Sequence, residues 1–106
     1  MKRVCFHLRV RPDRVAEYRQ RHMDVWPEMQ DALRATGWHN YTLFLADDGL
    51  VTGYLECEDF EESVGAMGHL EVNRRWQEEM AGLFEDMEGS QPDRAMRPLP
   101  EIFHVD

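Results

Sequence analysis

The first residues that could carry chemistry are Tyr18, His22 and Trp26, which are spaced four residues apart. Residues at this spacing lie on one face of a helix, so a phenol, an imidazole and an indole are expected to line up. The unperturbed pKa of histidine lies close to neutrality, which suits His22 to general acid–base catalysis. The same spacing is also typical of two core aromatic residues with a partly buried, hydrogen-bonded histidine between them.

Other aromatic side chains are predicted to face the same region. Tyr41 follows Asn40 at the start of a strand-like segment, and Tyr54 on the adjoining strand is expected roughly opposite it. Trp76 falls on the apolar face of a later helix. Each of these residues alone also fits an ordinary place in a turn, a sheet or a core. Together they are typical of an apolar pocket with a few orienting polar groups, which suits an uncharged, partly apolar ligand.

The sequence argues against several other kinds of site. It contains no phosphate-binding loop, no GxGxxG and no nucleophile elbow. Its five histidines are scattered with no pair at helical spacing, so neither a metal site nor a cofactor is expected. The net charge of −9, from 21 acidic and 12 basic residues, repels phosphate backbones and argues against a nucleic-acid partner.

The sequence also bears on location. No segment approaches the roughly 18 apolar residues of a membrane helix, so no membrane partner is expected. Residues 1–7 lack the apolar run and the cleavage site of a signal peptide. Cys5 and Cys57 lie far apart in strand-like segments, without metal-ligand spacing. We therefore predict buried free thiols and a cytoplasmic protein.

The elements that must position these residues begin with a half-buried strand, because apolar residues alternate over residues 4–10. Pro12 stops this strand and suits the first turn of a helix. Apolar residues then recur at spacings of three and four over residues 15–33. Pro27 cannot sit inside a helix without removing a hydrogen bond. We therefore predict a break just before Pro27, a restart there and a C-cap at Gly37.

The middle of the chain is predicted to form a β-hairpin. Residues 40–46 and 50–57 are strand-like, and the Asp48-Gly49 pair between them is a strong hairpin signal. Gly53 either weakens the second strand or marks the close approach of something bulky.

The second half of the chain repeats the pattern of a helical segment followed by a strand. Asp59–Glu62 has the form of a capping box, followed by a short helix to about Met67. A second amphipathic helix is expected over residues 72–87, ended by residues 89–92. Glu101–Val105 reads as a short last strand.

The order strand, helix, strand, strand, helix, strand predicts an α+β fold in one domain, residues 1–106. It is the ferredoxin-like (split βαβ) arrangement, an antiparallel sheet with helices on one face. Because the other face of the sheet needs cover, we predict a homodimer with a dimeric α/β barrel-like arrangement. The irregular C-terminal segment could cross to the partner.

The residues that carry a resemblance to a known family run through most of the chain. They are Tyr18-Arg19-Gln20-Arg21-His22, His22-Met23-Asp24-Val25-Trp26-Pro27-Glu28-Met29, Leu33, Gly37, Asn40-Tyr41, Tyr54-Leu55-Glu56, Arg75-Trp76 and Glu101-Ile102-Phe103. With them the chain resembles the L-rhamnose mutarotase family over nearly its whole length. The most specific part is the His-x-x-x-Trp-Pro-Glu segment with a tyrosine four residues earlier.

The resemblance implies a small dimeric ferredoxin-like enzyme of the cytoplasm, working without a cofactor. Its activity would be the interconversion of the α and β anomers of an aldose sugar, L-rhamnose. The resemblance makes His22 the catalytic proton donor and implies that Tyr18, Tyr41 and Trp76 contact the sugar. Trp26 is expected to join Trp76 in packing against the C–H face and the 6-methyl group.

Two positions depart from the family pattern. Gln77 stands where the family often carries a second aromatic residue, and its amide could bind a hydroxyl but not stack on the ring. Trp38 is larger than the small residue expected beside Tyr41. Both departures bear on sugar preference, so L-lyxose and L-mannose stay open beside L-rhamnose.

Two other classes of function stay open. Dimeric monooxygenases or isomerases acting on aromatic or polyketide-like small molecules share this fold, and a fold does not fix a function. Oxygen consumption with a phenolic substrate would identify the first of these. A non-catalytic ligand-binding or subunit-interaction module would keep its function when His22 is replaced.

Overall fold

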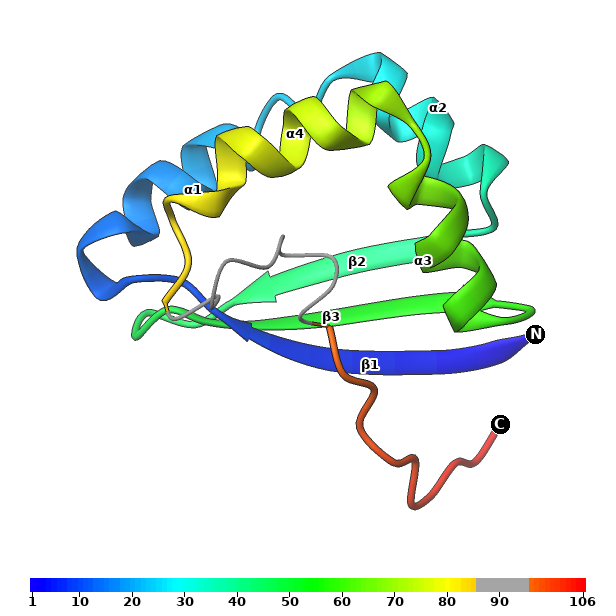
Figure 1. The fold of residues 1–106 in the computed structure, drawn as a ribbon. Helices are drawn as coiled ribbons and strands as arrows, with labels where there is room; N and C mark the ends of the chain where they lie inside the picture. The colour runs from blue at the N-terminus through cyan, green and yellow to red at the C-terminus, as the bar shows by residue number, and fades with distance from the viewer. Residues whose placement is uncertain (86–95) are drawn as a thin grey trace.

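The computed structural model describes residues 1–85 and 96–106. Its elements are β1 (Lys2–Arg9), the short 3-10 helix η1 (Pro12–Arg14), α1 (Val15–His22), α2 (Pro27–Ala35), β2 (His39–Leu45), β3 (Leu50–Cys57), α3 (Phe60–Gly68) and α4 (Glu71–Ala81). The three strands form an antiparallel sheet in the order β1-β3-β2. The helices all cover one face of this sheet, which confirms the α+β, ferredoxin-like arrangement (Figure 1).

The predicted last strand, Glu101–Val105, is wrong. The C-terminal segment pairs with β1 at an isolated bridge between Pro98 and Phe6, next to which the Leu99 N–H donates to the Cys5 carbonyl over 2.7 Å. Pro98 and Pro100 lack the N–H groups that a longer ladder needs. Pairing therefore stops at once, and the C-terminal segment runs away from the sheet (Figure 1).

Pro27 divides the first helical segment, which confirms the predicted break. α1 ends at His22 and α2 begins at Pro27, where a missing N–H is no loss because first-turn N–H groups have no partner in the helix. Gly37 follows the end of α2 with a φ of 90°. The Trp38 N–H donates back to the Leu33 carbonyl over 2.9 Å, so the predicted stop at Gly37 is confirmed. The break leaves His22 at the end of a helix, where its ring is not confined by a following turn.

α4 is shorter than the helix predicted over residues 72–87. It ends at Ala81, and the Leu83 carbonyl accepts a hydrogen bond of 2.8 Å from the N–H of Arg11, just beyond β1. Backbone pairing with the end of the first strand therefore overrides the helical periodicity. Met87 and the stop signal predicted after it lie outside the described residues.

Two predicted turn signals are confirmed. The Asp59 side chain accepts a hydrogen bond from the Glu62 N–H over 3.1 Å and so caps α3. Gly49 ends the hairpin turn with a φ of 97°, and its carbonyl accepts from the Val10 N–H over 2.8 Å. The hairpin turn is thus fixed to the end of the first strand.

An irregularity in β2 decides which way Tyr41 points. The register against β3 shifts just before Thr42, and Asn40 adopts a φ of 53° there, which asparagine tolerates better than most residues. Thr42, not Tyr41, stands opposite Tyr54. The two tyrosines are therefore roughly opposite, as predicted, but the offset of one residue means that they do not face the same region. Since neighbouring residues on a strand point to opposite faces, Tyr41 faces the helices and Tyr54 the open side.

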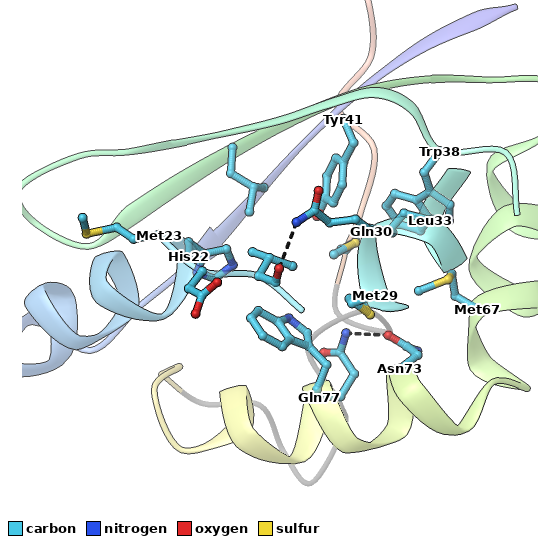
Figure 2. Close-up of a pocket in the computed structure, with 15 residues that line it drawn as sticks. His22, Met23, Met29, Gln30, Leu33, Trp38, Tyr41, Met67, Asn73 and Gln77 are labelled. Carbon is cyan, nitrogen blue, oxygen red and sulfur yellow. Dashed lines mark hydrogen bonds between the residues drawn. The ribbon is translucent and has the colours of Figure 1, made fainter. Parts of the chain in front are cut away.

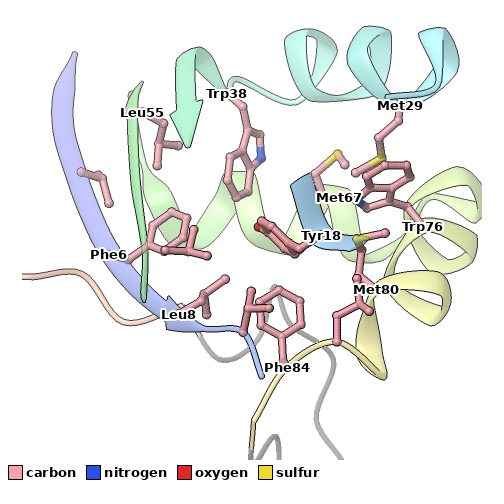
Figure 3. Close-up of a cluster of buried hydrophobic side chains, with 14 of the residues drawn as sticks. Phe6, Leu8, Tyr18, Met29, Trp38, Leu55, Met67, Trp76, Met80 and Phe84 are labelled. Atoms are coloured by element: carbon pink, nitrogen blue, oxygen red, sulfur yellow. The ribbon is translucent and has the colours of Figure 1, made fainter. Parts of the chain in front are cut away.

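The core lies between the sheet and the helices (Figure 3). Its buried side chains include Phe6, Leu8, Tyr18, Met29, Trp38, Leu55, Met67, Trp76, Met80 and Phe84. The Phe6 ring is fully buried against Gly53, where a Cβ atom would come within 2.3 Å of its Cζ. The close approach predicted at Gly53 is therefore confirmed.

The cysteines and the helices bear on two further predictions. Both cysteines are free thiols, but only Cys57 is buried and Cys5 is partly exposed, so the prediction of buried thiols holds for Cys57 alone. None of the helices described is long and apolar enough to cross a membrane.

Candidate functional site

A cavity of about 520 Å³ opens between the helices and β2 (Figure 2). Its apolar wall includes Met29, Leu33, Trp38, Leu43, Met67 and Trp76. Its polar or partly polar side chains are His22, Asp24, Gln30, Tyr41, Asn73 and Gln77. This composition, an apolar wall combined with several polar groups, is typical of a small-molecule site.

The imidazole of His22 is oriented by the helix that ends with it. Its Nδ1 lies 2.9 Å from the backbone carbonyl oxygen of Tyr18, one turn earlier in α1. A carbonyl can only accept a hydrogen bond, so Nδ1 must carry the proton. The other nitrogen, Nε2, then has the lone pair and no partner among residues 1–85 and 96–106. The helix thus fixes both the tautomer and the direction of the ring.

Burial sets the protonation state of His22. Its pKa lies below the ordinary value for histidine, chiefly because the charged ring loses hydration in the cavity wall. The hydrogen bond to the Tyr18 carbonyl favours the charged form but does not reverse the shift. The ring is therefore neutral at neutral pH and can accept a proton at Nε2 and return it, as a general acid–base group does.

Aromatic rings surround His22 and form one wall of the cavity. Trp76 stands almost perpendicular to the imidazole with the ring centroids 5.6 Å apart, and Trp26 packs edge-on against Trp76 at 5.0 Å. On another wall Tyr41 meets Trp38 at 4.9 Å. The Trp38 indole N–H donates to the Ser63 carbonyl of α3 over 3.2 Å, which fixes this large side chain in place.

The structure brings four of the six predicted site residues to the cavity wall: His22, Tyr41, Trp76 and Gln77. The other two, Tyr18 and Trp26, pack directly behind this wall. Tyr18 is buried with its ring 4.3 Å from the His22 ring, and burial raises the pKa of its phenol, which stays neutral. Trp26 supports Trp76 in the same way.

Sequence reasoning did not single out Asn73 and Gln30 as cavity residues. Asn73 is 2% exposed, and its Oδ1 accepts a hydrogen bond of 3.0 Å from Nε2 of Gln77. It stands four residues before Gln77 in a predicted helix, so helical spacing was the signal that could have found it. Gln30 has no comparable signal in the sequence. In the structure its exposed amide donates to the Val25 carbonyl of the connection before α2.

Ion pairs hold the helices that carry the site. The Arg21 guanidinium of α1 donates to the Glu79 carboxylate of α4 over 2.8 Å and to Glu17, one turn back, over 3.3 Å.

Across the part of the chain that the structure describes, no group of three or more His, Cys, Asp or Glu side chains could hold a metal ion.

Comparison with known proteins places this chain in a family. The sequence model described as L-rhamnose mutarotase matches residues 3–105. The chain belongs to the L-rhamnose mutarotase family. Its relatives include L-rhamnose mutarotases of Bacillus subtilis, 41% identical over 107 residues, and Oceanobacillus iheyensis, 36% identical over 107 residues, each matched over the full length of both chains.

Two solved structures share the fold of this family member. The L-rhamnose mutarotase of Formosa agariphila superposes with a TM-score of 0.79 at 20% identity, and tetracenomycin F2 cyclase of Streptomyces glaucescens with a TM-score of 0.53 at 17% identity. Both comparisons cover 100% of each chain. At these sequence identities the structural similarity shows that the fold is shared, but it does not show a shared activity.

Proposed function

We propose that this protein is an isomerase that interconverts the α and β anomers of L-rhamnopyranose. Membership of the L-rhamnose mutarotase family over residues 3–105 supports the activity and the sugar. The single structural observation that carries the proposal is the tether between His22 Nδ1 and the Tyr18 carbonyl. It presents a neutral imidazole, with a basic Nε2, to a cavity walled by aromatic rings.

The reaction opens and recloses the sugar ring. The hydroxyl on C1 loses its proton, the ring oxygen O5 gains one, and the C1–O5 bond breaks to leave an aldehyde at C1. Rotation about C1–C2 presents the other carbonyl face before the ring closes. Because O1 and O5 share one carbon, a single base can take the proton from O1 and deliver it to O5. We assign this transfer to His22 Nε2, which acts first as a base and then as the proton donor.

The remaining predicted residues have binding or supporting roles in this proposal. Trp76 packs against the C–H face and the methyl group of the sugar, with Trp26 holding its indole in place. Tyr41 and Gln77 meet hydroxyl groups from two other walls. Tyr18, packed against the imidazole behind the cavity wall, supports the sugar site by keeping the ring of His22 in position. Much of the acceleration then comes from positioning.

We also propose that the protein works as a homodimer formed through the open face of the sheet. Phe44 on β2 is 62% exposed there, and Ile102 in the C-terminal segment is 94% exposed. Two sheets packed face to face would remove such apolar groups from water. The result would be the dimeric, α/β barrel-like assembly expected from the sequence.

The free thiols support a cytoplasmic location within this proposal. Cys5 and Cys57 form no disulfide, as expected of a protein in a reducing compartment. We treat residues 1–106 as one ferredoxin-like mutarotase domain.

Saturation-transfer NMR on equilibrated L-rhamnose tests the activity directly. Irradiating one anomeric proton should reduce the signal of the other only when the protein is present, because the protein exchanges the two anomers. Exchange with L-lyxose or L-mannose but not L-rhamnose would keep the mechanism and change the sugar. The absence of anomer exchange across a panel of aldoses would overturn the proposal. Oxygen consumption with a phenolic substrate would then test the monooxygenase alternative.

A further inference from the structure

The side chain of Gln77 is buried in the cavity wall with part of its hydrogen-bonding capacity unused. It is 6% exposed, and its only hydrogen bond among the described residues runs from Nε2 to Oδ1 of Asn73. The carbonyl oxygen Oε1 and the second N–H of the same amide have no partner in this part of the chain. Buried polar groups are nearly always hydrogen-bonded. An amide left open on the wall of a cavity therefore indicates a ligand that completes it.

We propose that Gln77 recognises two neighbouring hydroxyl groups of the sugar, a vicinal diol, with Asn73 as its positioning residue. In this arrangement Oε1 accepts a hydrogen bond from one hydroxyl while the free N–H donates to the oxygen of the next. The inference rests on the proposed function, because it assigns a substrate group to the same cavity. It gives Gln77 a selective role that an aromatic residue at this position could not have.

The chemistry of the open groups selects a diol over other ligands. A carboxylate or phosphate offers only acceptors, so it has no donor for Oε1. Its negative charge would also be repelled by the Oε1 carbonyl and by a protein of net charge −9. An ammonium offers only donors and would leave the N–H of the amide unpaired. Hydroxyls both donate and accept, so two of them on adjacent ring carbons can satisfy an acceptor and a donor that share one amide plane.

The position of Gln77 decides which hydroxyls it can meet. His22 enters the cavity from the end of α1, whereas Gln77 enters from α4 (Figure 2). With C1 and the ring oxygen at His22, the amide meets hydroxyls further round the ring, which are those on C2, C3 and C4. The proposal thus places recognition and proton transfer on different helices.

Asn73 holds the amide in the orientation that this recognition needs. Its side chain is 2% exposed, and its Oδ1 accepts from Gln77 over 3.0 Å. Because the acceptor fixes which end of the Gln77 amide carries nitrogen, it also fixes which side presents Oε1 to the cavity. The two residues are one turn apart on α4, so the helix itself sets their spacing.

Deleting the amide and the sugar hydroxyls in combination tests this proposal. Gln77→Met keeps the length of the side chain and removes its hydrogen bonds. Binding of L-rhamnose and of its 2-deoxy, 3-deoxy and 4-deoxy analogues is measured by calorimetry with both proteins. For the unaltered protein, removing either of two adjacent hydroxyls should weaken binding about tenfold, the size of a lost hydrogen bond that leaves a buried partner unpaired. For Gln77→Met, the same removals should change binding less than about twofold.

Gln30→Met is the matched control, because it makes the same substitution at another amide of the cavity wall. This amide is exposed and already binds the Val25 carbonyl, so the losses with the deoxy sugars should stay as large as in the unaltered protein. Asn73→Ala should reduce those losses although it leaves Gln77 in place. A residue that only stabilises α4 would not change the preference among hydroxyl groups.

The outcomes separate this inference from the proposed function. Equal losses in the unaltered protein and Gln77→Met, with anomer exchange still present, would overturn the role of Gln77 and leave the proposed function standing. If L-rhamnose neither binds nor exchanges, the proposed function fails and this inference fails with it. Sensitivity to a single hydroxyl that Gln77→Met abolishes would contradict the diol, because one of the two amide groups would then stay unpaired.

Discussion

The two faces of the sheet are made by the same three strands but differ in what covers them. On the covered face Phe6 and Leu55 are completely buried, and the cavity opens between this face and the helices. On the open face Phe44 lies exposed, and Tyr54 binds Glu56 of its own strand over 2.7 Å. The alternation of a strand decides which face a residue joins. What that face does depends on what packs against it.

The comparison assigns different chemistry to the two faces. Helices bring side chains from distant parts of the sequence to the covered face, so that His22 of α1 and Gln77 of α4 line one cavity. The open face gathers residues from neighbouring strands, where the side chains of Asn40 and Tyr54 both donate to Glu56. We therefore expect substitutions on the covered face to affect catalysis or folding, and those on the open face to affect assembly.

The largest effect is expected from His22→Ala on the covered face. Removing the group that transfers the proton should lower the rate of anomer exchange by about 100- to 10,000-fold. Saturation-transfer NMR measures the rate, and circular dichroism checks the fold, which should persist because His22 is only partly buried. An unfolded variant would favour the alternative that His22 is a structural residue of the core.

The next largest effect is expected on the open face, from Phe44→Glu. A charge buried in the proposed interface without a partner should weaken dimerisation by about thirtyfold or more. Analytical ultracentrifugation measures this, with Met23→Glu as the control. Met23 is 74% exposed but lies on the helix side, so its variant should stay dimeric. Equal assembly of the two variants would place the interface elsewhere.

The pH dependence of the exchange rate should be set by His22, which lies on the covered face. The pKa of His22 is lowered by burial, so its basic form predominates at neutral pH and is lost only when the pH falls through that lowered value. The rate should therefore fall about tenfold per pH unit below a midpoint that is more acidic than the usual value of about 6.5. A midpoint above this value would contradict the assignment of His22 as a neutral base.

A smaller effect is expected from Gly53→Ala, which tests how tightly the covered face is packed. The new Cβ would meet the Phe6 ring at 2.3 Å, so the ring must move, and the free energy of unfolding should fall by about 1–3 kcal/mol. Gly65 in α3 has no atom within 4 Å of the corresponding position. Gly65→Ala should therefore stabilise the protein by about 0.5–1 kcal/mol. Urea denaturation measures both variants.

Local signals in the sequence predicted most of the fold. Pro27, Gly37 and Asp59 act within one helical turn of themselves, so their effects were readable from neighbouring residues. The end of α4 was not readable, because it depends on backbone bonds to Arg11, far away in the sequence. The missing last strand depends on Pro98 and Pro100, whose effect appears only once the edge of β1 is in place.

The candidate site was predicted in the same uneven way. Helical spacing placed His22 and Tyr18 on one face correctly, but it could not tell which of them borders the cavity. The side on which Tyr41 falls depends on the irregular register at Asn40. That irregularity is a single backbone conformation, which the sequence indicates only by placing an asparagine there.

The tether of His22 to the Tyr18 carbonyl has a consequence for motion. Helix ends fray, and His22 is the last residue of α1, so opening of that final turn would release Nδ1 and let the ring change tautomer and direction. Under the proposed role of His22, only molecules in which this turn is closed present the imidazole correctly for reaction. A bound sugar that contacts Nε2 would favour the closed turn and slow hydrogen exchange of its amides. The proposed activity of His22 would therefore depend on a local folding equilibrium one helical turn in length.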